Sequence, residues 1–351
     1  MQKTIFVVDD NDTNLSTAEK ALEEQYQVMT LPSAAAMFEF LEEVTPDLIL
    51  LDIEMPEMDG FEALRQLKAS ELHGAIPVIF LTSMIDASIE VRGFEMGAVD
   101  FITKPFSAPV LKNRIKTHLS IDDLIRERTA QLEQLRNGLV FILTDIVESR
   151  DKATGGHIER TSEYVKILTG AMVARGVYAD ELRSLNLESF AAAARLHDVG
   201  KIAIPDAVLS KLGSLTLEEF EMIKTHTVAG ERIIDKVLAR SGDLEFLRNA
   251  KLFAGYHHER WDGSGYPRGL KEKEIPLQGR ILAVADLYDA LLSDRPYQRT
   301  FTEEEVISII MDNSGIMFDP VIVEAFFEVK EQFSEARRNW RHPEGALSQP
   351  S

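Results

Sequence analysis

Seven side chains suited to metal binding are spread through the second half of the sequence. They are five histidines and two aspartates: His157, His197, Asp198, His226, His257, His258 and Asp286. Any one of them alone has an ordinary structural explanation, such as a histidine that donates to a carbonyl at a helix end. Together they are too many ligands for one metal ion of ordinary coordination, but they suit two. Two ions about 3.5 to 4 Å apart can hold a hydroxide for in-line attack on phosphorus, so the set indicates phosphoester hydrolysis.

The adjacent pair His197 and Asp198 is compatible with two ions rather than one. Neighbouring residues of a helix point about 100° apart, so these two side chains cannot stack on one face. They can serve neighbouring ions, with the carboxylate bridging and the imidazole bound to one metal. The sequence has no cysteine, so any metal must be held by His, Asp and Glu. These ligands favour harder ions than a thiolate site selects.

A second group of polar side chains follows the apolar runs of the first 120 residues. Asp9 and Asp10 follow the first run, Asp52 the third, Thr82 the fourth and Lys104 the fifth. Because the carboxyl ends of parallel strands meet at one edge of a sheet, we expect these side chains to lie together. Three carboxylates, a hydroxyl and an amine predict a Mg²⁺ site with a candidate phosphoacceptor.

The elements that must position this second group are five βα units. The runs TIFVVDD, YQVMTL, DLILLDIEMP, IPVIFLTS and VDFITKP alternate with amphipathic stretches such as TNLSTAEKALEEQ and GFEALRQLKAS. Runs such as DLILL are apolar on consecutive positions, as in parallel strands that are covered on both faces. Residues 1–120 are therefore predicted to form an α/β doubly wound domain with a five-stranded parallel sheet.

Residues 121–146 are predicted to form a helical linker. Leu132, Leu135, Leu139, Ile142 and Ile146 recur at spacings of three and four, and Ile121, Ile125 and Arg128 continue the pattern upstream. One interpretation is a single helix on a domain surface, and the other is a coiled-coil-like connector that pairs with a second copy in a homodimer. Residues 147–336 read as an all-helical domain, and residues 337–351 as a disordered tail.

Length and charge bound the remaining possibilities. With 351 residues the chain is too long for one ordinary core, so we expect two or more domains. A formal net charge of −20 argues against broad DNA binding, which depends on Lys and Arg neutralising phosphates. No run approaches the roughly 18 to 20 apolar residues of a membrane span, and MQKTIFVVDD is unlike a signal peptide. We therefore expect a cytoplasmic protein with no DNA or membrane partner.

Residues 1–120 resemble a two-component receiver domain. The resemblance rests on VVDD, LLDIEMPEMDG, LTS and DFITKPF, which occur in this order. It implies that Asp52 is phosphorylated by a sensor histidine kinase and that Asp9 and Asp10 bind Mg²⁺ with it. It also implies that Lys104 contacts the phosphoryl group and that Thr82 and Phe101 respond to the modification. A phosphoryl group adds charge and acceptors that can draw a hydroxyl and a loop toward it.

The helical half resembles the HD-GYP cyclic dinucleotide phosphodiesterases. The resemblance rests on HDVGK, LTLEEFEMIKTH, HHERWDGSGYP and ADLYDALLSDRPY. It implies an all-helical fold, a dinuclear or trinuclear centre usually filled by iron or manganese, and cleavage of cyclic di-GMP to linear pGpG or onward to GMP. The seven histidines and aspartates named above would be the ligands, with Asp198 also catalytic. Lys201 would contact the substrate phosphate or the bridging hydroxide.

Four further positions refine this interpretation. Arg280 and Arg295 are candidates for binding phosphate, because guanidinium groups match phosphate oxygens, although a salt bridge is the alternative for Arg280. Tyr266 is predicted either to contact substrate or to brace the loop that holds the histidines. Ala153 stands four residues before His157, where family members with a third metal usually carry glutamate. We therefore expect two ions, with pGpG as the main product.

The leading hypothesis is a response regulator whose phosphorylation at Asp52 controls hydrolysis of cyclic di-GMP. One alternative is a signalling module that binds a nucleotide or a partner protein without turnover. Another is a phosphodiesterase that prefers cyclic GMP-AMP.

Overall fold

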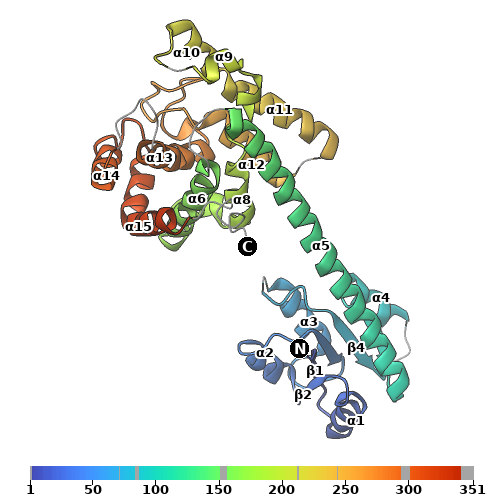
Figure 1. Ribbon diagram of the computed structural model, residues 1–351. Coiled ribbons are helices and arrows are strands. Elements are labelled where there is room, and N and C mark those ends of the chain that lie inside the picture. The colour runs from blue at the N-terminus through green and yellow to red at the C-terminus, as the bar shows by residue number, and fades with distance from the viewer. Residues whose placement is uncertain are drawn as a thin grey trace, which may run out of the picture. The chain divides into compact units, whose positions relative to one another are not determined.

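The computed structural model describes residues 2–70, 72–83, 87–150, 156–211, 213–242, 244–293 and 301–340. These residues form two compact units, Met1–Glu133 and Gln134–Ser351, and one long helix, α5 (Ala108–Arg150), contributes to both (Figure 1). No helix among the described residues is long and apolar enough to cross a membrane.

The first unit is built on a parallel sheet of five strands in the order β2-β1-β3-β4-β5. The strands are β1 (Thr4–Val8), β2 (Gln27–Leu31), β3 (Leu48–Asp52), β4 (Val78–Thr82) and β5 (Asp100–Thr103). The helices that connect them are α1 (Asp12–Leu22), α2 (Ala34–Leu41), α3 (Gly60–Ala69) and α4 (Ala87–Glu95), and α5 follows β5. The doubly wound α/β fold predicted for residues 1–120 is confirmed.

Alternation along the strands explains why helices cover both faces. Phe6 and Val8 of β1 pack in one apolar layer, whereas Ile5 and Val7 pack in the other. All five residues of β3 and of β4 are buried, as expected for central strands of a parallel sheet. The carboxyl ends of β1, β3, β4 and β5 therefore lie at one edge, where the polar side chains of the receiver site are found.

Local signals in the sequence start the helices at this edge. The side chain of Asn11 caps α1 and that of Asp59 caps α3, each accepting from backbone amides of the first turn. Gly60 is required by close packing, because a Cβ atom there would lie 2.2 Å from the carbonyl oxygen of Asp52. The start of α3 is thus held directly against the end of β3.

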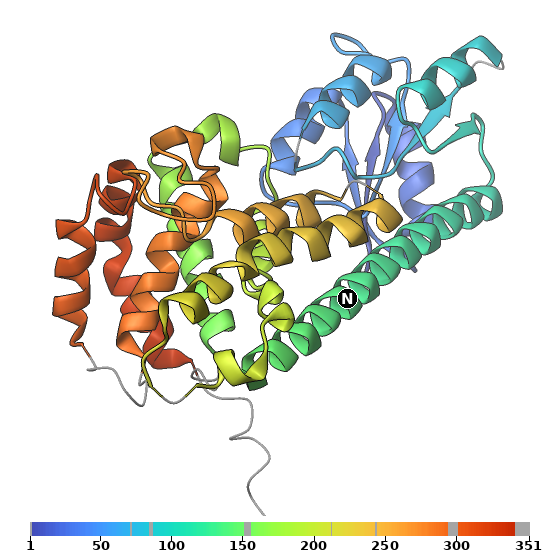
Figure 2. The same cartoon turned by 90° about the horizontal axis from the view of Figure 1, so that it is seen from above.

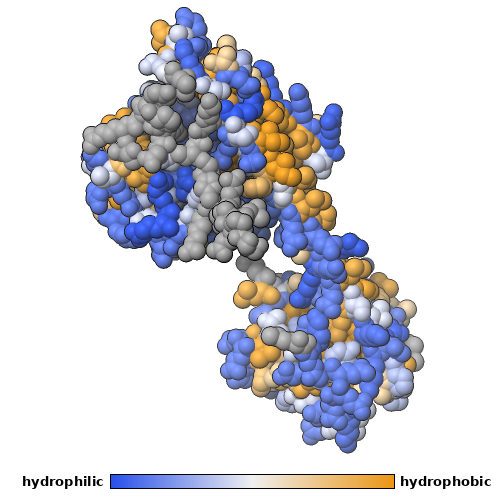
Figure 3. Space-filling view, viewed as in Figure 1, coloured by the Kyte–Doolittle hydropathy of each residue, from blue (hydrophilic) through white to orange (hydrophobic). Residues whose placement is uncertain are grey.

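Helix α5 is longer at both ends than the predicted linker. Val140, Thr144 and Val147 are buried within the second unit. The predicted apolar stripe lies elsewhere on the helix and is exposed, and Leu132 is 67% exposed. Its other exposed members are Ile121, Ile125, Leu135, Leu139, Ile142 and Ile146. Figure 3 shows hydrophobic side chains along α5.

The second unit is helical, as predicted. Its helices are α6 (His157–Ala174), α7 (Ala179–Leu182), α8 (Leu187–Ala194), η1 (Val199–Ala203), α9 (Asp206–Leu209), α10 (Leu217–Lys224), α11 (His226–Ser241), α12 (Glu245–Tyr256), η2 (Glu272–Glu274), α13 (Leu277–Leu292), α14 (Glu303–Asp312) and α15 (Pro320–Asn339). Helix α6 packs against α8, α13 and α15 (Figure 2). An aromatic core joins α6, α13 and α15, with the rings of Tyr164 and Phe333 stacked at 4.7 Å and Tyr288 edge-on to both.

The predicted boundary of the tail at residue 337 is wrong by three residues. Helix α15 continues to Asn339, and Arg337 near its end donates to the carbonyl of Leu292. Residues 341–351 lie outside the described part of the chain.

Candidate metal centre and receiver site

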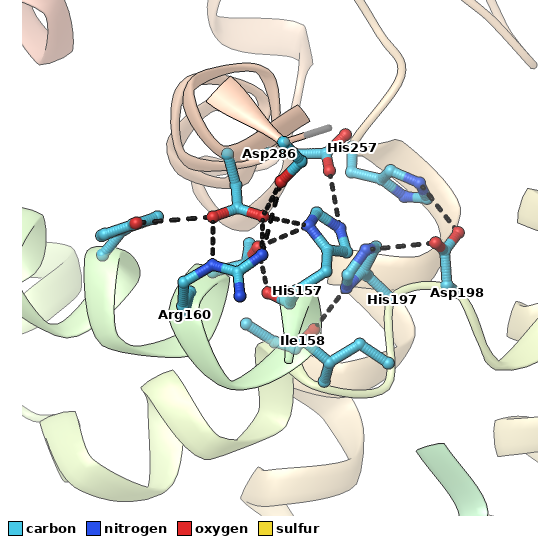
Figure 4. A network of polar contacts seen from close by, with 12 residues as sticks. His157, Ile158, Arg160, His197, Asp198, His257 and Asp286 are labelled. Carbon is cyan, nitrogen blue, oxygen red and sulfur yellow. Dashed lines mark hydrogen bonds and ion pairs between the residues drawn. The ribbon is translucent and has the colours of Figure 1, made fainter. Parts of the chain in front are cut away.

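The seven predicted metal ligands converge from five segments of the second unit. His157 begins α6, His197 and Asp198 lie between α8 and η1, His226 begins α11, His257 and His258 follow α12, and Asp286 lies in α13. The ligand atoms of His226, His257 and His258 lie within 4.8 Å of one another, and so do those of His157, His197 and Asp198. Asp286 Oδ1 lies 3.2 Å from His157 Nε2 (Figure 4). The chain therefore forms two neighbouring groups of candidate ligands.

The tautomers of three histidines are fixed by the backbone. Each ring donates from Nδ1 to a carbonyl about one turn earlier: His197 to Ala194 at 2.8 Å, His226 to Ile223 at 2.7 Å, and His257 to Phe253 at 2.9 Å. A carbonyl can only accept, so each Nδ1 carries the proton and each neutral ring keeps a lone pair on Nε2. This is how metal-binding histidines are usually oriented.

Two of these Nε2 lone pairs face each other, and the third is buried without a hydrogen-bond partner among the described residues. The Nε2 atoms of His226 and His257 lie 3.3 Å apart. His197 Nε2 is buried and has no hydrogen-bond partner within the described residues. Buried acceptors without donors are costly, and a cation resolves the conflict. The donor set therefore fits divalent metal ions held by imidazole and carboxylate.

Asp198 lies between the two groups. Its Oδ1 is 3.4 Å from His226 Nε2, and its Oδ2 is 3.4 Å from His197 Nε2. One carboxylate thus faces a histidine of each group, which is the arrangement expected of a bridging ligand.

Burial and charge hold His226, His257, His258 and Asp198 in their metal-binding protonation states. Burial lowers the pKa of His226, lowers that of His257 well below its ordinary value, and lowers that of His258 to about 4. Burial alone would raise the pKa of Asp198, but the nearby positive charge of Lys201 leads the opposing effects and that pKa lies well below the ordinary value. Neutral imidazoles and an ionised carboxylate are the forms that bind metal.

Glycine and lysine in HDVGK have separate structural roles. A Cβ atom on Gly200 would lie 1.9 Å from the carbonyl oxygen of His226, so glycine allows η1 to pack against the start of α11. This contact brings Asp198 toward His226. Lys201 Nζ lies 2.8 Å from Asp198 Oδ2. Both residues line a cavity of about 290 Å³, the metal cavity, together with His157, His226, His258 and Asp286.

The loop after the paired histidines is held from within. Buried Glu259 accepts from the amides of Arg268 at 2.7 Å and Leu270 at 3.0 Å. Gly263 has a φ of 83°, a left-handed conformation that favours glycine. The ring of Tyr266 packs 4.7 Å from that of His258 and also lines the metal cavity. Its position is compatible with both predicted roles, supporting the histidines and facing a ligand.

Sequence reasoning missed Asp289, which orients His157. Asp289 is fully buried and accepts from His157 Nδ1 at 2.8 Å. It also accepts from Arg160 through Nε at 2.7 Å and Nη2 at 2.8 Å. Asp286 and Asp289, through their hydrogen bonds and charges, outweigh the effect of burial and raise the pKa of His157 to about 10. The available signal was a second aspartate, three residues after Asp286, in the apolar helix ILAVADLYDALL.

The last turn of α5 was also missed as part of this site. Glu148 lines the metal cavity and accepts from the amides of Ile158 at 3.0 Å and Gly156 at 3.4 Å, on either side of His157. Arg150 donates to the carbonyls of Ile202 at 3.0 Å and Ile204 at 2.9 Å, just after Lys201. The end of α5 therefore contacts both segments that carry the ligand group of His157, His197 and Asp198.

For Arg280 the structure supports the salt-bridge alternative. Its guanidinium is buried, donates to Asp319 Oδ2 at 2.8 Å and to the carbonyl of Ile275 at 2.8 Å, and lies over the ring of Tyr178. It joins α13 to the start of α15, away from the residues that line the metal cavity. The predicted roles of Arg295 and Ala153 fall outside the described residues.

The receiver residues meet at the predicted edge of the sheet. Candidate ligand atoms of Asp9, Asp10 and Asp52 lie within 4.8 Å of one another. Lys104 Nζ is 2.7 Å from both Asp9 Oδ2 and Asp52 Oδ1. Burial raises the pKa of Asp52, although the hydrogen bond and charge of Lys104 oppose this effect. An acidic, partly shielded cluster of this kind suits Mg²⁺.

The predicted switch residues are buried beside this cluster. Thr82 ends β4 and Phe101 lies in the neighbouring strand β5. The ring of Phe101 packs between those of Phe80 and Phe94.

Two family descriptions match the chain. Residues 5–116 match the response regulator receiver domain, and residues 142–322 match the HD domain. A probable cyclic di-GMP phosphodiesterase of Vibrio cholerae is 39% identical, over 99% of this chain and 82% of its own length. The cyclic di-GMP phosphodiesterase response regulator RpfG of Xanthomonas campestris is 36% identical, over 82% of this chain and 77% of its own length. A 3'3'-cGAMP-specific phosphodiesterase of Vibrio cholerae is 35% identical, over 59% of this chain and 37% of its own length.

The fold and these matches define the class: a response regulator that joins a receiver domain to an HD domain. The chain belongs to the family of cyclic di-GMP phosphodiesterase response regulators.

Proposed function

We propose that the second unit hydrolyses cyclic di-GMP to linear pGpG with two divalent metal ions, iron or manganese. The observation that carries this proposal is the pair of ligand groups whose buried imidazoles direct Nε2 lone pairs toward one another. A module that only bound nucleotide or protein would have little use for buried acceptors without donors.

The chain's own residues would hold and orient the reactants. Divalent ions, when bound, lower the pKa of water and stabilise negative charge on phosphate oxygens. Asp198 would contribute one carboxylate oxygen to each ligand group. Asp289 would orient the ring of His157 so that the Nε2 atom of His157 is directed at a metal. Lys201 would place its ammonium against a phosphate oxygen at the mouth of the cavity.

Turnover of cyclic di-GMP by iron-loaded or manganese-loaded protein tests this proposal. Accumulation of pGpG supports it. Stoichiometric release of GMP would contradict the proposed product and the two-ion interpretation of Ala153. The relative named for cyclic GMP-AMP makes that nucleotide the second candidate substrate. Rates measured side by side on both nucleotides decide between them.

We also propose that phosphorylation of Asp52 by a sensor histidine kinase, with Mg²⁺ bound by Asp9, Asp10 and Asp52, controls the rate. The acidic cluster and the contact between Lys104 and Asp52 support this role. In the presence of a phosphodonor, Asp52→Asn should change the phosphodiesterase rate or the oligomeric state relative to the parent. Identical behaviour of the two proteins would contradict control by phosphorylation.

The exposed stripe on α5 supports a homodimer paired through this helix. An apolar stripe with spacings of three and four on an exposed helix is the pattern that pairs in coiled coils. Sedimentation of the parent as a dimer, and of a Leu135→Glu/Leu139→Glu variant as a monomer, is the expected result.

The proposal places the protein in the cytoplasm, where further signalling proteins would be its partners.

A further inference from the structure

A second cavity of about 630 Å³ lies beside the metal cavity. Tyr266 lines both of them. The second cavity is otherwise bounded by Pro267, by Ala203 of η1, by the end of α10 and by the start of α11. Its lining includes Glu221, Lys224, Val228 and Arg232. Because one ring borders both spaces, a ligand bound at the metal cavity can extend past Tyr266 into the second.

The lining of the second cavity contains two cations, Lys224 and Arg232, and one carboxylate, Glu221, in a protein whose formal net charge is −20. Lys224 Nζ lies 4.9 Å from the centre of the Phe220 ring and 5.4 Å from that of Tyr266. Its ion pair is with Glu221 at 2.6 Å, and the Glu221 side chain is 68% exposed. The carboxylate of this pair is open to solvent, although the Lys224 side chain is only 27% exposed, so the pair contributes little and an anionic ligand can displace the glutamate.

Arg232 adds a second cation to the same lining. It lies on α11, six residues after the ligand His226, and its side chain is exposed. It forms no ion pair with another described residue. A guanidinium in this state is available for bidentate binding of a phosphate.

The chemistry of the proposed substrate calls for such a space. A cyclic dinucleotide has two phosphodiesters and two purines in one ring, and only one phosphodiester can be at the metal ions. The other phosphate needs a cation, and the purine beside it needs apolar and aromatic surface. Lys224 and Arg232 offer the first, while Tyr266, Pro267 and Val228 offer the second.

We propose that this second cavity is the subsite for the half of the cyclic dinucleotide that is not being cleaved, with Lys224 and Arg232 binding its phosphate. The proposal rests on the proposed phosphodiesterase function and adds a site that determines substrate size. A diester with one phosphate and no second nucleotide would use the metal cavity alone.

Two substrates separate the subsite from the metal site. In metal-loaded full-length protein, Lys224→Met and Arg232→Met should each lower kcat/KM for cyclic di-GMP about tenfold relative to kcat/KM for bis(4-nitrophenyl) phosphate. Most of the change should be a higher KM. Lys236→Met is the matched control, because Lys236 is an exposed lysine on α11, the helix of Arg232, and lies outside the cavity lining. Equal effects on both diesters, or none, would overturn the subsite.

Calorimetric titration with cyclic di-GMP keeps this test independent of turnover. Binding about tenfold weaker in Lys224→Met and Arg232→Met than in the parent supports the subsite, even in a protein that cleaves nothing. In that case the proposed hydrolysis fails while the subsite stands. Unchanged affinity in both variants overturns the subsite whatever the rate of hydrolysis.

Discussion

The Nε2 atoms of His226 and His257 lie 3.3 Å apart, and both rings donate a hydrogen bond from Nδ1 to a backbone carbonyl. Two lone pairs at this distance in a buried site repel each other. A divalent cation bound between the two Nε2 atoms would remove this repulsion. The same helix ends that fix the tautomers hold the rings in place.

Replacing both adjacent histidines, His257→Ala/His258→Ala, should remove metal and phosphodiesterase activity together. The ligand group of His226, His257 and His258 then retains only His226. Elemental analysis of the purified variant measures the loss. His73→Ala, in the receiver unit, is the control and should retain the parent's metal content. A variant that keeps full metal content would show that these histidines are not ligands.

Asp289→Asn should weaken metal binding by about 10- to 100-fold, because His157 loses the carboxylate that orients it. The substitution also leaves buried Arg160 beside a neutral partner, which should lower the free energy of unfolding by about 3 kcal/mol. Chelator competition measures the affinity and thermal unfolding measures the stability. Asp312→Asn, exposed on α14, should change neither. Loss of stability with unchanged metal affinity would limit Asp289 to a structural role.

Glu148→Ala should loosen the start of α6 and thereby the position of His157. The carboxylate accepts from two amides that flank this ligand, and loss of such a cap lowers the free energy of unfolding by about 1 kcal/mol. Metal affinity should fall, and Glu148→Gln, which keeps one acceptor oxygen, should restore part of it. Glu133→Ala on the exposed part of α5 is the matched control. Equal metal affinity in Glu148→Ala and the parent would contradict this positioning role.

Lys201→Met should lower kcat by about 10²- to 10³-fold while the metal content stays near that of the parent. The rate should fall because the ammonium of Lys201 lines the cavity beside Asp198. The metal content should stay because a protonated amine has no lone pair to bind a metal. Steady-state kinetics with parallel elemental analysis separates the two effects. A parallel loss of metal and activity would instead assign Lys201 to holding Asp198 in place.

The sequence predicted most of the fold because both halves carry strong local patterns. Alternation within Ile5–Val8 and the apolar runs of β3 and β4 require a sheet that is covered on both faces. The candidate metal ligands were predicted from five histidines and two aspartates taken together, and from the resemblance carried by HDVGK and HHERWDGSGYP. Gly200 fits the same pattern, since its packing against α11 brings the two segments together.

The rest depends on contacts between residues that lie far apart in the chain. Arg280 looked like a phosphate ligand, but its partner Asp319 is 39 residues away and no local pattern indicates the pair. Asp289 lies 132 residues from His157, so its role depends on how α13 packs against α6. Glu148 accepts from a backbone amide of another helix, and a backbone amide is present whatever the residue type, so the sequence does not indicate this contact.

The central claim is that two metal ions in the second unit cleave cyclic di-GMP. Metal analysis of the full-length protein, combined with a cyclic di-GMP assay on the same sample, tests it most directly. The account predicts two iron or manganese ions per chain, distinct from receiver Mg²⁺, and conversion of cyclic di-GMP to pGpG that ceases when the ions are chelated. Protein that forms no linear product with iron, manganese or nickel would contradict it.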